Sequence, residues 1–289
     1  MSKITKLGLG IVAFEGTEHI KNITYEVREL VDEIVICLQQ HSYHGEDIDP
    51  KDVETIKDLQ AHGLVDKIIW FEEDEKYKHP KTEEDRQENP RRMEADKRNF
   101  ILDFLEKEDC SHSMITDSDE FYDRNEFATA KAIINNSPDM HVTYCQYINY
   151  WKDYRHYLVW PFYAFCPFIT ESKYRFSYRA RCFNGAIDPT RIYLLKDDEY
   201  YHTFNWNTVR MHHLSWIRLD IRKKISSWSA KKYFGDDFGK KVYDKFMNWK
   251  EYECALITLN VPKHKVIVNR LPKQYIHPHY RLNQGLDEE

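Results

Sequence analysis

The stretch LGLGIVAF, residues 7–14, is an unbroken apolar run with the length of a buried β-strand. A helix-like segment follows it, and a second apolar run, EIVICL, occupies residues 33–38. A helical pattern over residues 50–62 then leads to a third run, DKIIWF, at residues 66–71. This alternation of strands and helices predicts an α/β architecture with a parallel sheet.

An acidic turn follows the next predicted strand. Residues 72–92 are very polar, which predicts an exposed loop, and residues 93–106 have the apolar spacing of a helix. The short apolar run SMIT, residues 113–116, then ends in Asp117-Ser118-Asp119-Glu120. Because ligands gather at the carboxyl ends of strands in open α/β sheets, this turn lies where such folds carry their chemistry.

The chain changes character after residue 138. Residues 144–163 alternate apolar and polar positions and are rich in Tyr and Trp, which predicts strands with one solvated face. The remaining predicted elements are strands at residues 165–170 and 191–195, helices at 217–234 and 238–251, and a Pro-punctuated tail at 271–289 that wraps the surface.

Composition excludes several classes of protein. A chain of 289 residues that is 42% hydrophobic can build a core, so it is neither a disordered tail nor a fibre. The net charge of -6 argues against a broad basic surface that wraps nucleic acid. No apolar run reaches the length of about 18 residues that a membrane span needs, and we expect a cytoplasmic protein. The cysteines form no CxxC pair, which favours reduced, buried thiols at Cys37, Cys110, Cys145, Cys166, Cys182 and Cys254.

The sequence Asp117-Ser118-Asp119 has a direct chemical use. Two carboxylates on one turn supply hard oxygen ligands for Mn²⁺ or Mg²⁺ and leave other positions for water and phosphate. A solvated acidic turn is the alternative, since D-x-D occurs by chance in many chains. The buried strand and the basic helix that precede the turn favour the metal site.

This combination resembles the GT-A class of nucleotide-sugar glycosyltransferases over residues 7–228. The segments RRMEADKRNF, DSDEF, VWP and HHLSWIRLDIRKKISSWSAKKYF further resemble the bisecting (β-1,4-mannosyl-glycoprotein) N-acetylglucosaminyltransferase family. His213-Leu214-Ser215-Trp216 matches the H-x-S-W part of that family's W-H-C-S-W segment, whereas His212 replaces its first Trp and Leu214 its Cys.

The resemblance implies one Rossmann-like catalytic domain over residues 1–289, with a mixed sheet flanked by helices and a helical C-terminal portion. Residues 1–125 would bind the nucleotide sugar and residues 126–215 the acceptor, followed by C-terminal helices and the tail at 216–289. The implied reaction is an inverting transfer of a hexosyl or N-acetylhexosaminyl group from a nucleoside-diphosphate sugar, UDP-linked, to an acceptor hydroxyl.

The resemblance also implies a metal set. Asp119 would be the main cation ligand, with Asp117 reaching the cation or the ribose and His213 as the third ligand; imidazole favours Mn²⁺ over Mg²⁺. Glu120 would fix the turn or pair with the basic helix. The alternative for His212 and His213 is a pair of ordinary strand residues, one buried and one exposed.

The donor contacts follow from the same comparison, whereas the candidate general bases and acceptor contacts are chosen by residue type. The implied nucleotide-sugar contacts are Phe14, Glu15, Arg92, Arg98, Asp117 and Ser118. Arg98 could instead pair with Glu94 on a solvated helix face, and Phe14 could be a core residue. The candidate general bases are Asp188 and Asp198, and the candidate acceptor contacts are Trp151, Asn184 and Gly185. Solvated turn acids and core aromatic residues are the corresponding alternatives.

Two other functions remain open. The acids could hold metals in a nucleotidyltransferase or nuclease, although residues 7–14 lack a G-x-G-x-x-[RK] phosphate loop. The aromatic content would also suit a non-catalytic carbohydrate-binding protein. For a glycosyltransferase, the acceptor could be a glycan, a lipid-linked sugar, a protein or a modified nucleic-acid base.

Overall fold

The chain forms two compact units, as described by a computed structural model. The first comprises Met1–Tyr147 and Ala164–Met211, and the second Ile148–Tyr163 and His212–Glu289. The described residues are 3–14, 16–42, 46–74, 77, 81–137, 139–159, 164–178, 186–187, 190–196, 201–227, 236–250 and 267–270. The single-domain subdivision at residues 125 and 215 stays a prediction.

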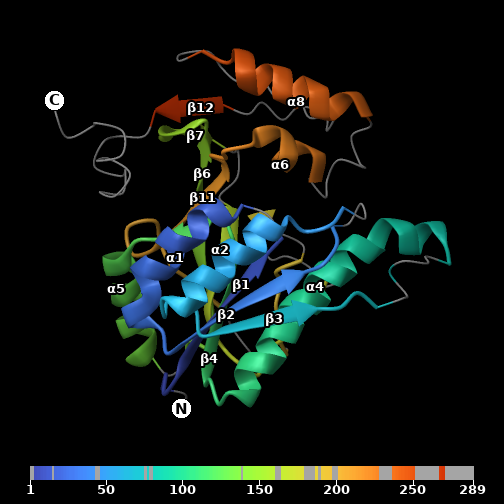
Figure 1. The fold of residues 1–289 in the computed structure, drawn as a ribbon. Coiled ribbons are helices and arrows are strands. Elements are labelled where there is room, and N and C mark those ends of the chain that lie inside the picture. The colour runs from blue at the N-terminus through green and yellow to red at the C-terminus, as the bar shows by residue number, and fades with distance from the viewer. Residues whose placement is uncertain are drawn as a thin grey trace. The chain divides into compact units, whose positions relative to one another are not determined.

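The parallel part of the sheet in the first unit contains four predicted strands, all confirmed (Figure 1). They are β1 (Leu7–Ala13), β2 (Glu33–Gln39), β3 (Lys67–Phe71) and β4 (His112–Asp117), in the spatial order β3-β2-β1-β4. Every residue of β1 is buried. An unbroken apolar run is therefore what this position requires, because both faces of the strand are covered.

Helices connect these strands. The segment η1 (Thr17–His19), α1 (Ile20–Val27) and η2 (Arg28–Leu30) joins β1 to β2, and α2 (Pro50–Ala61) joins β2 to β3. The long helix α4 (Glu83–Lys107) joins β3 to β4, which lies on the other side of β1, and contacts β1, β2 and β4. Since parallel crossovers are right-handed, this reversal places α4 on the sheet face opposite to α1 and α2.

Helix α4 is longer than the sequence pattern indicates. The prediction of a loop up to residue 92 is wrong, because the helix begins at Glu83. Thr82 caps it, with its Oγ1 accepting a hydrogen bond from the Asp85 N–H at 3.0 Å. Arg92 pairs with Asp85 and Glu88 at 3.0 and 2.5 Å. Such ion pairs stabilise a polar helix that has no apolar stripe to reveal it.

The rest of the sheet is antiparallel at its centre, which confirms the predicted mixed α/β sheet. Strand β8 (Ala164–Glu171) pairs antiparallel with β4 and with β6 (Val142–Trp151). The short strands β9 (Ala186–Ile187) and β10 (Tyr201–Thr203) pair parallel with β8 and β6, respectively.

The predicted strand at residues 191–195 is wrong, since only Tyr193 forms a bridge, to Phe176. Strand β5 (Glu120–Tyr122) and helix α5 (Arg124–Asn135) follow β4 and were not predicted.

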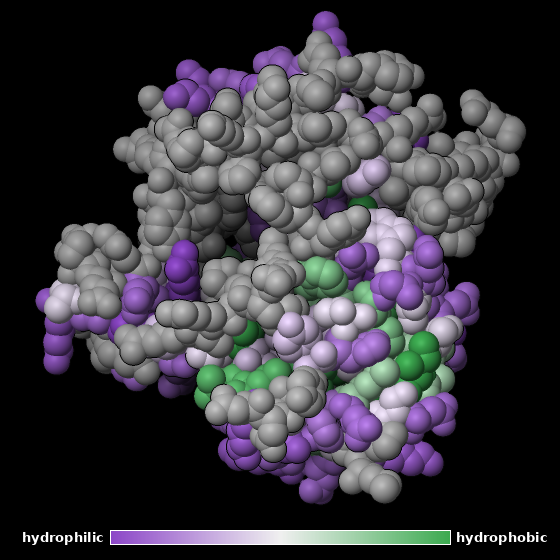
Figure 2. Space-filling model, turned by 180° about the vertical axis from the view of Figure 1, so that it is seen from behind, coloured by the Kyte–Doolittle hydropathy of each residue, from purple (hydrophilic) through white to green (hydrophobic). Residues whose placement is uncertain are grey.

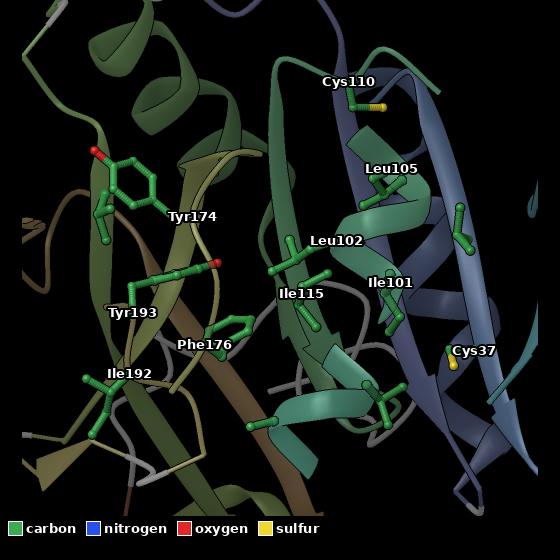
Figure 3. Close-up of a cluster of buried hydrophobic side chains, with 14 of the residues drawn as sticks. Cys37, Ile101, Leu102, Leu105, Cys110, Ile115, Tyr174, Phe176, Ile192 and Tyr193 are labelled. Carbon is green, nitrogen blue, oxygen red and sulfur yellow. The ribbon is translucent and has the colours of Figure 1, made fainter. Parts of the chain in front are cut away.

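One buried cluster packs α4 onto the sheet (Figure 3). Ile101, Leu102 and Leu105 of α4 lie beside Ile115 of β4. The rings of Phe176 and Tyr193 extend the cluster, stacked with their centroids 4.2 Å apart. The residues after β8 are therefore anchored to the same core as α4.

The second unit contains the end of β6 and the strands β7 (Asp153–Val159), β11 (Arg210–Trp216, which begins in the first unit) and β12 (Ile267–Arg270). Its helices are α6 (Ile221–Ser227) and α8 (Asp236–Asn248), so the predicted helix at 217–234 begins later than expected. Its core comprises Trp151, Leu158, Ile221, Ile225, Val242 and Phe246. The expected solvated face of residues 144–163 is wrong for Tyr144, Tyr150 and Trp151, which are buried. The predicted tail at 271–289 lies outside the described residues.

The surface mixes residue types. Figure 2 shows apolar residues interrupted by hydrophilic ones over the described part of one face. The exposed large apolar residues of the first unit come from separate elements and are Tyr25, Trp70, Phe100 and Leu194. Among the helices that the structure describes, none has the length and apolarity to cross a bilayer.

Candidate active site

The acidic turn (residues 117–120) lies where the strand order of the parallel sheet reverses. Asp117 ends β4 opposite Val12 of β1, and the Ser118 N–H donates to the Val12 carbonyl at 3.1 Å. From β1 the chain proceeds to β2 on one side, while β4 lies on the other. The turn therefore occupies the topological switch point, where open α/β sheets bind their ligands.

Local hydrogen bonds fix the shape of the turn. The Asp117 N–H donates to Glu120 Oε2 at 3.1 Å, which confirms that Glu120 fixes the turn. Asp123 then caps α5, its Oδ1 accepting from the backbone N–H groups of Asn125 and Glu126 at 2.8 and 3.0 Å. A buried strand, an acidic turn and a capped helix thus follow each other within a few residues.

Arg98 of α4 contacts the turn directly. Its Nη2 donates to Asp117 Oδ1 at 2.9 Å and to Oδ2 at 3.3 Å. Its Nη1 donates to Glu94 Oε2 at 2.6 Å and to Thr190 Oγ1 at 3.2 Å. The i,i+4 pair of Arg98 with Glu94 is thus observed, but the side chain is buried rather than on a solvated face, and it also contacts the acidic turn. The nucleotide-sugar contact stays a prediction.

Arg191 reaches the same carboxylate from the segment that follows β9. Its Nη1 donates to Glu120 Oε1 at 2.6 Å, and its Nη2 donates to Asp117 Oδ2. Both Arg191 and Glu120 are buried. Asp117 therefore lies between two guanidinium groups that come from different parts of the chain.

Lys97 extends the charged cluster toward β2. Its Nζ donates to Gln39 Oε1 at 2.9 Å and to Glu94 Oε1 at 3.0 Å. Gln39 in turn donates from Nε2 to Glu73 Oε1 at 2.6 Å. The carboxyl ends of β2 and β4 are thus joined through α4.

The charges of this cluster nearly balance. Three cations (Lys97, Arg98 and Arg191) contact three carboxylates (Glu94, Asp117 and Glu120). Burial raises the pKa of Asp117, but Arg191 and Arg98 outweigh that effect and hold the pKa below its usual value. Asp117 is therefore ionised at neutral pH, and the buried Asp119 beside it adds a fourth carboxylate that gives the cluster a net negative charge.

The other predicted site residues that the structure describes belong to several elements. Phe14 follows β1 and is half-buried, Arg92 is paired within α4 and lies over the Tyr178 ring at 5.2 Å, and Ser118 is buried in the turn. His213 is half-buried on β11 in the second unit, while its neighbour His212 is buried, with Nδ1 2.7 Å from the Tyr150 hydroxyl.

Trp151 is not available to an acceptor. Its side chain is fully buried and packs against Trp216 and Phe246, with ring centroids 5.1 and 5.0 Å apart. Its assignment as an acceptor contact is therefore corrected to a core role. The predicted residues Glu15, Asn184, Gly185, Asp188 and Asp198 lie outside the described residues.

Arg191, Thr190 and Gln39 also belong to this cluster and were not predicted from the sequence. Each contacts the cluster through a long-range interaction, such as Arg98 with Thr190 across 92 positions. No spacing rule within a single sequence reports such a pairing. Arg191 lies three positions after the predicted site residue Asp188 in the sequence.

The contacts of Asp117 bear on its suitability as a ligand for a divalent cation. Both oxygens of Asp117 accept hydrogen bonds from guanidinium groups, so this carboxylate does not fit a cation ligand in the observed arrangement. Asp119 is the other carboxylate of the D-x-D and has the hard oxygen chemistry that Mn²⁺ and Mg²⁺ require. Within the described residues, no group of three or more His, Cys, Asp or Glu side chains is gathered around one point.

The chain was compared with known families, proteins and structures. No protein-family model matches the sequence, and no curated protein is significantly similar to it. The chain is similar to the crystal structure of S. aureus TarS, with 11% sequence identity and a TM-score of 0.39. The match covers 84% of this chain and 42% of the TarS chain, so this chain spans less than half of that structure. A likeness with so low a TM-score does not indicate an activity. The resemblance to the bisecting transferase family stays a prediction.

Proposed function

We propose that this chain is a metal-dependent glycosyltransferase that moves a sugar from a nucleoside-diphosphate sugar, UDP-linked in the simplest case, to an acceptor hydroxyl. The observation that carries the proposal is the position of the acidic turn at the switch point, next to the buried cations Arg98, Arg191 and Lys97. A diphosphate and its cation need this combination of carboxylates and guanidinium groups.

The proposed roles follow from the site. Asp119 would hold the cation, and Phe14 at the end of β1 would contact the nucleoside. When bound, Mn²⁺ or Mg²⁺ would supply Lewis-acid stabilisation of the charge that develops on the leaving diphosphate. Asp188 or Asp198 would accept the proton of the acceptor hydroxyl in an inverting transfer.

Donor turnover tests this function. The protein is incubated with UDP-, GDP- and CDP-linked sugars and Mn²⁺, and we expect release of one nucleoside diphosphate by slow donor hydrolysis, abolished by EDTA. Asp119→Asn should remove this activity with little change in melting temperature, whereas Glu54→Gln, on the exposed face of α2, should not.

Two results would contradict the proposal. One is the absence of turnover with all three donor classes together with no melting shift by any nucleotide. The other is release of pyrophosphate from a nucleoside triphosphate, or cleavage of a nucleic acid, in place of donor turnover; that result would favour a nucleotidyltransferase or nuclease.

A further inference from the structure

The two arginines of the cluster are held in a fixed relation to each other. Asp117 Oδ2 accepts from Nη2 of both Arg98 and Arg191, so one carboxylate oxygen joins the two guanidinium groups. Two like charges at this separation repel strongly when buried, and the shared carboxylate is what keeps them together.

Each guanidinium also has a second anchor. Arg98 is held through Nη1 by Glu94, and Arg191 is held through Nη1 by Glu120. Thr190, the neighbour of Arg191, accepts from Arg98 at 3.2 Å. Because a guanidinium is planar, two anchors fix its orientation as well as its position.

Stability alone does not account for this arrangement. Buried ion pairs contribute little compared with well-packed apolar residues of the same volume, since each charge must be desolvated. Six paired charges at the ligand-binding edge of the sheet instead indicate a preorganised site, because sequences depart from the rules of good packing mainly where they function.

We propose that Asp117 is a positioning residue that aligns Arg98 and Arg191 to bind the diphosphate of the donor, while the cation is bound by Asp119. This inference rests on the proposed function. With a divalent cation at Asp119, the four carboxylates and three basic side chains of the cluster have a net charge of about +1, which favours an anionic diphosphate. In the acidic turn, Asp117 thus aligns the two arginines and Asp119 binds the cation.

Binding measurements on Arg191 variants test the inference. We expect Arg191→Gln to weaken UDP binding in saturating Mn²⁺ by about tenfold to hundredfold, the range for losing a charge-assisted hydrogen bond, and to leave uridine binding unchanged. If the wild-type protein binds GDP or CDP instead, the same comparison uses that nucleotide and its nucleoside. Unchanged diphosphate affinity in Arg191→Gln would overturn the inference.

A double variant separates ligand binding from structure. Asp117→Asn with Arg191→Gln removes one charge of each sign, so we expect it to recover the melting temperature that Arg191→Gln loses but not the affinity for UDP. Recovery of both would show that Arg191 is merely structural and would overturn the inference.

A third experiment measures the binding of Mn²⁺ in the absence of nucleotide. Asp117→Asn should retain Mn²⁺ binding and Asp119→Asn should lose it; the reverse order would overturn the division between the two aspartates. A wild-type protein that binds no nucleoside diphosphate at all would refute the proposed function itself, which is a different result from nucleotide binding that is indifferent to Arg191.

Discussion

Gly10 of β1 lies directly against Ile101 of α4. A Cβ at residue 10 would come within 2.3 Å of Ile101 Cγ2 and 2.7 Å of Ile115 Cδ1. Gly8, two positions earlier on the same face, would bring a Cβ within 2.6 Å of Leu105 Cδ2. The two glycines of LGLGIVAF thus let α4 approach the sheet closely, which brings Arg98 to the end of β4.

Replacing Gly10 should disturb this packing. We expect Gly10→Ala to lower the free energy of unfolding by about 1–3 kcal/mol, because the added methyl group meets branched side chains that cannot move away. Chemical denaturation measures the change. Gly63→Ala is the comparison: it has φ +72° and nothing within 4 Å of a new Cβ, so its cost of about 1–2 kcal/mol would come from the backbone alone. If Gly10→Ala is neutral, α4 does not pack as described.

Two Arg–Glu ion pairs of similar length differ in burial and should differ in their contribution to the free energy of unfolding. Arg191 Nη1 lies 2.6 Å from Glu120 Oε1, with side-chain exposures of 5% and 3%, whereas Arg124 Nη1 lies 2.7 Å from Glu29 Oε2, with exposures of 38% and 75%. We expect Glu120→Gln to cost about 3–5 kcal/mol, because it leaves a buried guanidinium undercompensated, and Glu29→Gln to cost about 1 kcal/mol or less. Urea unfolding compares the two, and equal costs would contradict the burial of the cluster.

The parallel half of the fold could be predicted because its signals are local. Each buried strand is a short apolar run, and each helix between them has its own periodicity. The first turns of α4 escaped prediction because they are stabilised by ion pairs such as Arg92 with Glu88 rather than by an apolar stripe. The strand expected at residues 191–195 has the right composition, but Tyr193 packs on Phe176 instead of joining the sheet.

In the candidate site too, only residues with a local sequence signal could be predicted. Asp117 and Arg98 could be named from the sequence, because the acidic turn follows a strand and the arginine lies on the helix before it. Arg191 could not, since its partner Asp117 is 74 positions away. Asn99 illustrates the opposite case: it is the neighbour of Arg98 on α4, but its side chain donates to the Phe176 carbonyl at 3.0 Å and accepts from the Phe176 N–H at 2.8 Å, which is a structural role.

His112 should make the protein sensitive to mild acid. It is fully buried on β4, and within the described residues its Nε2 has no hydrogen-bond partner. Burial lowers the pKa of His112, helped by His141 and Lys173 and opposed by Glu171. In the unfolded chain His112 becomes protonated near pH 6.5, whereas in the folded chain it stays neutral to a lower pH. The free energy of unfolding therefore falls as the pH decreases below about 6.5.

An uncharged replacement isolates this effect. We expect His112→Asn to reduce the dependence of the unfolding free energy on pH between about 7 and 5, whatever its effect at neutral pH. Denaturation in urea at several pH values measures the slope. A slope in His112→Asn equal to that of the wild type would show that this histidine titrates normally.

The four cysteines that the structure describes are free and buried. Cys145 and Cys166 lie opposite each other on β6 and β8, with their Sγ atoms 3.5 Å apart, and Cys37 and Cys110 lie in the core cluster. Burial raises the pKa of Cys37 to about 12 and that of Cys110 to about 11. It also raises the pKa of Cys145 well above its usual range.

These four cysteines should therefore resist alkylation until the protein unfolds, because the thiolate is the reactive form and the side chains are inaccessible. Iodoacetamide pulses with and without urea, read cysteine by cysteine through peptide mass spectrometry, measure this protection; Cys182 and Cys254 are scored separately because they lie outside the described residues. We expect slow labelling in the native state and rapid labelling in urea. A disulfide between Cys145 and Cys166 in protein purified in the presence of an alkylating agent from lysis onward would contradict the expected reduced state.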